Sequence, residues 1–299
     1  MTDKFHEPVM VSEVLKHLLT RPRSIIADCT LGDGGHSEAV LSSTKDTFVV
    51  GMDVDSEALV VAEGRMRESH PGRFVAVKGD YRELPTVLAK LGIPAIDGAL
   101  FDLGVSSRQL DTLERGFSYW GEGPLDMRMN QEGGMTAADI LQTWSEEEIS
   151  RILREYGEER FSARISREIV RAREDHLLGT AKDLVETIKR AYPAAAKRGG
   201  PHPARRTFQA LRIATNDELS RLALSMERAV HLLRPGGVVA VLTYHSLEDR
   251  IVKNSFKGLI ERGAGVKVQR KPETASEAEV ARNARSRSAK LRVIERAWQ

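Results

Sequence analysis

The chain has 299 residues, 41% of them hydrophobic, with 45 Lys and Arg against 43 Asp and Glu, a net charge of +2. At roughly 150 residues per domain this length predicts about two domains, with a core large enough to need neither disulfides nor metal. The single cysteine, Cys29, excludes an internal disulfide and a multi-thiolate zinc site, and no metal is expected. No apolar run reaches the roughly 20 residues of a membrane helix, and the first residues lack the layout of a signal peptide. A cytoplasmic protein without membrane contact is therefore expected.

Short apolar segments alternate with helical patterns in the first third of the chain. Strands are predicted at 25–28, 48–53, 74–78 and 98–102, with helices over about 58–68 and 84–91. This alternation is typical of an α/β fold with a parallel sheet.

The next strand is predicted at 238–243, after a helical face that ends at the turn 234–237. A helix from Ser246 toward Ile260 and short strands near 266–268 and 290–294 complete the predicted sheet. The segment 272–287 between these two strands is rich in Ala, Glu, Ser and Arg, and is expected to stay mobile until a ligand binds it.

A long interruption separates two neighbouring strands of this sheet. From Asp102 to Val238 is 136 positions, whereas a βαβ unit takes roughly 30 or more. The surplus predicts an inserted, mainly helical domain at 108–203, interpreted as an RNA- or substrate-recognition domain. Residues 1–107 and 204–299 then form one discontinuous domain.

The loop 28–36 (DCTLGDGGH) follows the first strand and opens a helix. It lacks the lysine of a P-loop, and Ser37 stands where a dinucleotide fingerprint needs its third glycine. Asp28 and Asp33 would repel a pyrophosphate and suit a cationic ligand. The alternative is a purely structural strand-to-helix turn.

Further acids end the next strands, where ligands of such sheets bind. Asp53 ends the second strand and is suited to ribose hydroxyls, and Asp80 with Tyr81 follows the third and is suited to adenine. A positively charged sulfonium on an adenosine satisfies all these groups, so S-adenosylmethionine is the predicted cofactor. Asp102 ends the fourth strand, where its structural alternative is a turn cap. The Asp/Asn/Ser-Pro-Pro-aromatic motif common in amino-group methyltransferases is absent there.

Nine segments in the right order resemble one family over nearly the whole chain. They are 6–10 (HEPVM), 28–37 (DCTLGDGGHS), 102–111 (DLGVSSRQLD), 115–118 (RGFS), 123–129 (GPLDMRM), 156–161 (YGEERF), 202–213 (HPARRTFQALRI), 245–250 (HSLEDR) and 285–288 (RSRS). They resemble the family of ribosomal RNA small subunit methyltransferase H, the bacterial enzymes that methylate the N4 amino group of cytidine 1402 in 16S ribosomal RNA. The chain departs from the family pattern at Asp33, where relatives have Arg or Gly, at Tyr244, commonly Phe, and at Ala284, usually Pro.

The resemblance implies a class I S-adenosylmethionine-dependent methyltransferase sheet, Rossmann-like, with the helical insertion. It implies an RNA partner, 16S ribosomal RNA within the small subunit or a late assembly precursor, and leaves monomer and dimer open. It assigns cofactor contacts to Gly34, Gly35, His36, Asp53, Tyr81, Asp102 and Gln109.

Cytosine N4 is a poor nucleophile, so we expect catalysis mainly by positioning, helped by an acceptor for the amine proton. Asp102 is the first candidate acceptor and His245, just after the fifth strand, is the second. A buried, satisfied histidine is the commoner outcome for a lone His. Four aromatic residues are candidates to stack on a displaced base, although each is more often part of a core: Phe117, Tyr119, Trp120 and Phe208.

Positive charge is clustered despite the small total. Residues 197–212, which include Lys197 and Arg198, carry +5, and so do residues 267–292. In the insertion, arginines spaced four, three and four from Arg160 to Arg171 predict one stripe of a helix beside an apolar stripe at Phe161, Ile165 and Ile169. A solvated face is the alternative for any one of these regions. The candidate RNA contacts are Arg160, Arg164, Arg205, Arg206, Arg285 and Arg287.

Other functions stay open on the residues alone. A methyltransferase of DNA or of a small molecule is one, and an RNA-binding assembly factor without turnover is another. A dehydrogenase is disfavoured by Ser37 and Asp33.

Overall fold

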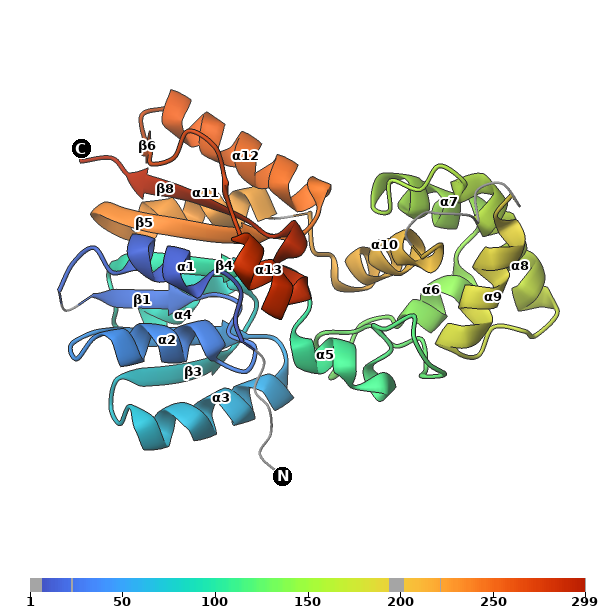
Figure 1. Cartoon of the computed structure of the whole chain (residues 1–299), viewed down its shortest axis with the longest axis horizontal. Coiled ribbons are helices and arrows are strands. Elements are labelled where there is room, and N and C mark those ends of the chain that lie inside the picture. The colour runs from blue at the N-terminus through green and yellow to red at the C-terminus, as the bar shows by residue number, and fades with distance from the viewer. Residues whose placement is uncertain (1–6, 23, 194–201, 221, 299) are drawn as a thin grey trace. The chain divides into compact units, whose positions relative to one another are not determined.

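The computed structural model describes residues 7–22, 24–193, 202–220 and 222–298 (Figure 1). The chain divides into two compact units, Met1–Gly104 with Leu219–Gln299, and Val105–Glu218. We call them the sheet unit and the helical unit. Within the described residues, no helix combines the length and apolar character needed to cross a membrane.

The sheet unit is built on eight strands in the order β3-β2-β1-β4-β5-β8-β6, with β7 paired to β8. β1 to β5 run parallel, and β8 runs antiparallel to β5, β6 and β7. The bounds are β1 Ile25–Asp28, β2 Phe48–Asp53, β3 Phe74–Lys78, β4 Ile96–Asp102, β5 Leu233–Thr243, β6 Gly265–Lys267, β7 Glu273–Thr274 and β8 Lys290–Arg296. The predicted α/β sheet is thus confirmed.

Two strands depart most from the prediction. β5 begins at Leu233, just before the expected turn 234–237, and includes that turn; Leu233 pairs with Ile96 across a register shift in the β4–β5 ladder. The two-residue strand β7 was not predicted, since a strand this short leaves no apolar period to detect.

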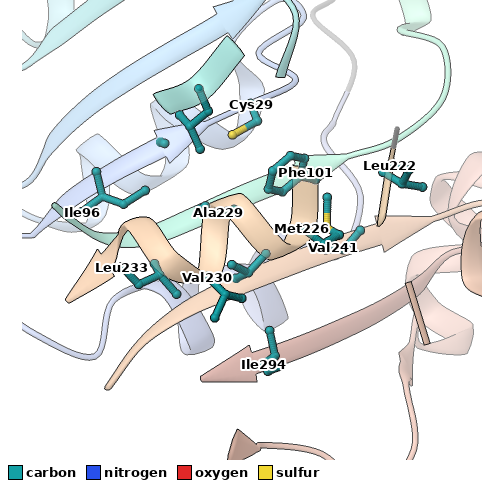
Figure 2. Close-up of a cluster of buried hydrophobic side chains, with 14 of the residues drawn as sticks. Cys29, Ile96, Phe101, Leu222, Met226, Ala229, Val230, Leu233, Val241 and Ile294 are labelled. Atoms are coloured by element: carbon teal, nitrogen blue, oxygen red, sulfur yellow. The ribbon is translucent and has the colours of Figure 1, made fainter. Parts of the chain in front are cut away.

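Helices cover both faces of the sheet (Figure 1). They are α1 Val11–Leu18, α2 Gly35–Ser43, α3 Ser56–Ser69, α4 Leu84–Lys90, α11 Leu222–Leu232, α12 Ser246–Glu261 and α13 Glu277–Arg282, with short 3-10 turns at Tyr81–Glu83 and Ala284–Ser288. On one face, Met226, Ala229 and Val230 of α11 pack against the strands that carry Phe101 and Val241 (Figure 2). Their helical spacing is what the sequence pattern predicts.

Cys29 lies in the same buried cluster, which agrees with a small core residue (Figure 2). Burial, followed by the charge of Asp28, raises the pKa of the Cys29 thiol well above its usual range. A thiol held neutral in this way is a poor nucleophile, so Cys29 serves packing.

The expectation of a mobile segment at 272–287 is wrong. It forms β7, α13 and the turn Ala284–Ser288. The Ser276 side chain accepts the Glu279 N–H at the start of α13, and the buried Glu279 carboxylate accepts the Met10 N–H at 2.7 Å. Asn283 donates to the Glu7 carbonyl at 3.0 Å. Composition alone suggested disorder. It could not reveal these partners, because they lie about 270 positions away in the chain.

The helical unit has a hydrophobic core of its own. Its helices are α5 Ser107–Asp111, α6 Ala137–Thr143, α7 Glu146–Glu155, α8 Ser162–Glu174, α9 Ala181–Ala191 and α10 Ala204–Asn216, with a 3-10 turn at Leu113–Arg115. Capping boxes at Thr136, Ser145 and Thr180 begin α6, α7 and α9. The inserted, mainly helical domain of the predicted fold class is thus present.

The boundary of the helical unit lies beyond the expected residue 203, because α10 packs within it. A Cβ on Gly157 would lie 2.7 Å from the Arg206 carbonyl oxygen, so only glycine permits this approach of α10. Gln209 donates to the Tyr156 carbonyl at 2.9 Å, and Asn216 bonds both Met127 and Met129 through their backbone. These contacts place 204–218 with the insertion rather than with the sheet.

Candidate cofactor site and catalytic residues

The glycine loop between β1 and α2 exposes backbone where a ligand can approach. Gly34 begins α2 with φ 83° and no side-chain cap, and Gly32 has φ 51°. A Cβ on Gly34 would also lie 3.1 Å from Ala62 Cβ. Gly35 follows, and a Cβ there would lie 3.1 Å from Pro8, so the N-terminal segment packs directly on this turn. The N-terminus of a helix and bare glycine backbone together form a ligand cradle.

Carboxyl groups end the three strands around this loop, with Asp28 buried and Asp53 and Asp102 half-buried. Asp28 accepts hydrogen bonds from Ser37 Oγ at 2.7 Å and from the Thr30 N–H at 3.3 Å. Asp53 accepts the N–H groups of Gly32 at 2.7 Å and Asp55 at 2.9 Å.

Burial raises the pKa of all three strand-end carboxyl groups. It raises the pKa of Asp53 to about 6, and the charges of Asp55 and Asp28 add to the effect. It likewise raises the pKa values of Asp28 and Asp102. A cation beside these groups would offset their repulsion and favour their charged forms. These three carboxyl groups therefore fit a sulfonium-bearing adenosine, as expected from the sequence.

Asp102 is held from three sides. Its Oδ1 accepts the Tyr244 hydroxyl at 2.6 Å, its N–H donates to Thr30 Oγ1 at 2.6 Å, and its Oδ2 lies 3.5 Å from His36 Nδ1. His36 Nε2 lies 2.9 Å from the Val9 carbonyl oxygen. Since that oxygen only accepts, Nε2 carries a proton and Nδ1 is the nitrogen that can share a proton with Asp102.

Tyr244 was noted in the sequence only as a departure from the family, and Thr30 was not singled out. Tyr244 directly follows the fifth strand, so its place at a strand end was the available signal. The hydrogen bond itself depends on β4 and β5 being neighbours, which the sequence pattern alone does not specify.

Tyr81 follows β3 and packs edge-on against Phe101, with ring centroids 5.9 Å apart. Asp80 accepts the Arg82 N–H at 2.8 Å and pairs with the Arg82 guanidinium at 2.6 Å. Its carboxylate is thus engaged locally, whereas the Tyr81 ring sits at the end of the strand as expected.

His245 begins α12, and both of its ring nitrogens face Glu248. Nδ1 accepts the Glu248 N–H at 3.4 Å, and Nε2 lies 3.0 Å from Glu248 Oε1 without hydrogen-bond alignment. Glu248 Oε2 in turn accepts the N–H groups of Tyr244 and His245. The ring thus caps the start of α12, as the structural alternative predicts, but its buried Nε2 has no hydrogen-bond partner among the described residues. Asp102 as first and His245 as second candidate acceptor both stay predictions.

Gln109 lies in the helical unit, whereas the other six candidate cofactor residues lie in the sheet unit. It is buried in α5, where its side chain accepts the Ser106 N–H at 3.0 Å while Ser106 Oγ accepts the Gln109 N–H. This reciprocal capping explains its burial, and its cofactor contact stays a prediction.

The candidate RNA-contact arginines are on the surface of both units. Arg160, Arg164, Arg205 and Arg206 are exposed in the helical unit, and in the sheet unit Arg287 is exposed and Arg285 half-buried. The predicted stripe is shorter than expected, because α8 begins at Ser162 and Arg160 and Phe161 precede it. Arg164, Arg167 and Arg171 lie on the helix, and their apolar neighbours Ile165 and Ile169 are fully buried.

Two members of the arginine stripe face acids. Arg167 lies 3.8 Å from Glu146 and Arg171 3.1 Å from Glu168. Lys197 and Arg198 of the basic run lie outside the described residues. Among the described residues, no group of three or more His, Cys, Asp or Glu is arranged to hold a metal ion.

The four aromatic candidates for base stacking separate into two pairs. Phe117 and Phe208 are buried in the core of the helical unit, as the commoner alternative predicts. Tyr119 is half-buried and Trp120 is exposed.

The sheet order, the glycine loop and the acids at the strand ends define a class I methyltransferase, whose cofactor is S-adenosylmethionine. The sequence profile of the MraW methylase family matches residues 3–297, and the chain belongs to this family. It is 48% identical over 308 residues to a relative from Heliobacterium mobile, covering 97% of this chain and 98% of the relative. It is 46% identical over 305 residues to one from Symbiobacterium thermophilum, covering 97% and 96%. Both relatives are named ribosomal RNA small subunit methyltransferase H.

The fold also resembles the crystal structure of an rRNA methylase from Streptococcus thermophilus. That likeness has a TM-score of 0.43 at 12% identity, and covers 96% of this chain and 93% of the other.

Proposed function

We propose that this protein methylates the N4 amino group of cytidine 1402 in 16S ribosomal RNA, using the small ribosomal subunit or a late assembly precursor as its substrate in the cytoplasm. The names of the two relatives support a small-subunit RNA substrate. The observation that carries the chemistry is Asp102, a half-buried carboxyl group at the end of β4, oriented by Tyr244 and next to His36.

S-adenosylmethionine supplies an electrophilic methyl group on a positively charged sulfur. Residues of the glycine loop and the strand ends hold it in this proposal: Gly34, Gly35, His36, Asp53, Tyr81 and Asp102, with Gln109 from the helical unit. Asp53 suits the ribose hydroxyls because its two oxygens keep lone pairs beyond those that accept Gly32 and Asp55.

Asp102 accepts the proton that cytosine N4 releases as the new N–C bond forms. Burial raises the pKa of Asp102 above its usual range, which makes its carboxylate a stronger base than an exposed one. The Tyr244 hydroxyl donates to Oδ1 and so fixes the carboxylate plane, which leaves Oδ2, 3.5 Å from His36 Nδ1, as the oxygen that takes up the proton in this proposal. The insertion and the exposed arginines, Arg160, Arg164, Arg205, Arg206, Arg285 and Arg287, contact RNA phosphates in this proposal.

The decisive experiment follows labelled methyl transfer from S-adenosylmethionine to small subunits purified from cells that lack the protein. Mass spectrometry of the RNA should show one N4-methylated cytidine, at position 1402, and free DNA should stay unlabelled. Asp102→Asn should lower the transfer rate about 10²- to 10⁴-fold, the contribution of general acid–base catalysis. Label on DNA alone, or none at this cytidine, would refute the proposal. Full function of the Asp102→Asn protein in cells would instead favour the non-catalytic assembly factor.

A further inference from the structure

Three aromatic rings of the helical unit form one stacked cluster at its surface. The Tyr119 and His202 rings lie nearly parallel, at 8°, with centroids 4.7 Å apart. The Trp120 ring lies 5.3 Å from Tyr119 and 4.9 Å from His202, tilted to both. Phe208 supports Tyr119 from the buried side, edge-on at 5.8 Å. The cluster is therefore anchored in the core at one end.

The other end of the cluster is left in water. Trp120 is 65% exposed, although burying so large a ring typically stabilises a fold by about 2 kcal/mol or more. An exposed large aromatic ring beside a built aromatic stack is an informative observation, because most such rings are buried.

The loop that carries Trp120 is held by a local hydrogen bond and by close backbone packing. The Trp120 N–H donates to Ser118 Oγ at 3.1 Å, and Gly121 has φ 121°. A Cβ on Gly123 would lie 2.1 Å from the Leu113 carbonyl oxygen, so the loop is packed tightly onto the turn Leu113–Arg115. The ring is thus presented by a preorganised loop, which lowers the entropy cost of binding a partner.

His202 links the aromatic rings to positive charge. Its Nδ1 accepts the Ala204 N–H at 3.3 Å, and its carbonyl oxygen accepts the Arg205 N–H at 3.0 Å, so it forms the turn that begins α10. Arg205 and Arg206 are exposed in the first turn of that helix. Burial, followed by the charge of Lys189, lowers the pKa of His202, which favours the neutral form of the stacked ring.

We propose that Tyr119, Trp120 and His202 form a stacking site for an unpaired nucleobase of RNA, with Arg205 and Arg206 on the adjoining phosphates. Aromatic faces take up splayed bases, and the neighbouring guanidinium groups complement the phosphate charge. An apolar peptide would leave both arginines without a counter-charge, and a paired duplex would offer no free base face. The inference rests on the proposed RNA substrate, and it joins two of the stacking candidates, Tyr119 and Trp120, to His202 in one site.

The test measures binding of the full chain to a fluorescein-labelled, ten-nucleotide single-stranded oligouridine by anisotropy. Loss of one base stack is worth about 1–3 kcal/mol, so Trp120→Ala should raise Kd about 5- to 150-fold. Trp120→Phe, which keeps a ring, should recover much of the affinity. Trp298→Ala is the matched control, because Trp298 is a 73% exposed tryptophan of the sheet unit. It should bind as the unchanged protein does.

Two further readouts separate stacking from charge and from misfolding. Trp120→Ala should keep the salt dependence of binding, since it removes no positive charge, and should bind a ten-base-pair RNA duplex with unchanged affinity. Equal oligouridine binding by Trp120→Ala and the unchanged protein would overturn the stacking site, and so would an equal loss in Trp298→Ala. Cytidine methylation in small subunits is scored separately, so a failure there refutes the proposed function while the oligouridine result still decides this site.

Discussion

Asp53→Asn should separate the stability of the free protein from its ability to bind the cofactor. Burial raises the pKa of Asp53 from its ordinary value of 3.8 to about 6, so the folded protein holds this proton to a higher pH than the unfolded chain does. The free energy of unfolding therefore falls as pH rises between about 4 and 6, and the loss is constant above that range. The difference of 2.2 pKa units corresponds to about 3 kcal/mol at neutral pH, at 1.36 kcal/mol per unit.

Asparagine removes this charge at every pH. Its amide oxygen accepts only one of the two N–H groups that the carboxylate accepts, those of Gly32 and Asp55, which costs about 1–3 kcal/mol independently of pH. The pH-dependent part remains. Relative to the unchanged protein, the variant should gain about 2 kcal/mol of stability between pH 4.5 and pH 7.5.

Urea unfolding of the free protein at these two pH values measures the gain, and calorimetric titration measures cofactor binding. At pH 7.5 the variant should bind S-adenosylmethionine about 10- to 100-fold more weakly, because hydrogen bonds to charged groups are worth about 1.5–3 kcal/mol. Asp46→Asn, at an exposed acid, is the control and should change neither quantity. A stability difference that is the same at both pH values would show that burial does not raise the pKa of Asp53 in the folded protein.

Three more outcomes are expected. Tyr244→Phe removes the hydrogen bond that lowers the pKa of Asp102, so the acid limb of the kcat–pH profile should move to higher pH; an unmoved limb would exclude Asp102 as the titrating base. Arg205→Ala combined with Arg206→Ala should weaken the salt dependence of binding to single-stranded RNA. The slope of log binding constant against log salt concentration should fall in magnitude by about 1.4, at about 0.7 per phosphate contact. An unchanged slope would place these arginines away from phosphate. Glu279→Gln weakens the bond to the Met10 N–H and should speed hydrogen exchange of that amide without changing exchange in the core of the helical unit, as followed by mass spectrometry.

The sheet was predictable because its strands are short apolar runs that end in acids, and parallel order brings those ends to one edge. Asp28, Asp53 and Asp102 were found this way, and their burial and raised pKa values follow from that edge. The helical character of the insertion was predictable from apolar spacing, as at Ile165 and Ile169.

Features that depend on contacts distant in the chain were not predictable. The order of α13 depends on Glu279 meeting Met10, and the extent of the insertion depends on α10 reaching Gly157. The catalytic candidacy of His245 came from its strand-end position, whereas its environment is decided by Glu248, three residues later, at a helix start. Spacing could have suggested that capping pair, although not the direction of the imidazole.

The contacts between α13 and the segment 7–10 affect when, during synthesis, the glycine loop is completed. Pro8 packs on Gly35, and Val9 faces His36, so the first described residues form one wall of the glycine loop. Those residues are themselves held by Glu279, Arg282 and Asn283, close to the end of the chain. A nascent chain that has already folded its first four strands therefore still lacks this wall, because the residues that hold it lie about 270 positions after the segment 7–10. The glycine loop is completed only after α13 has been made and has packed onto that segment.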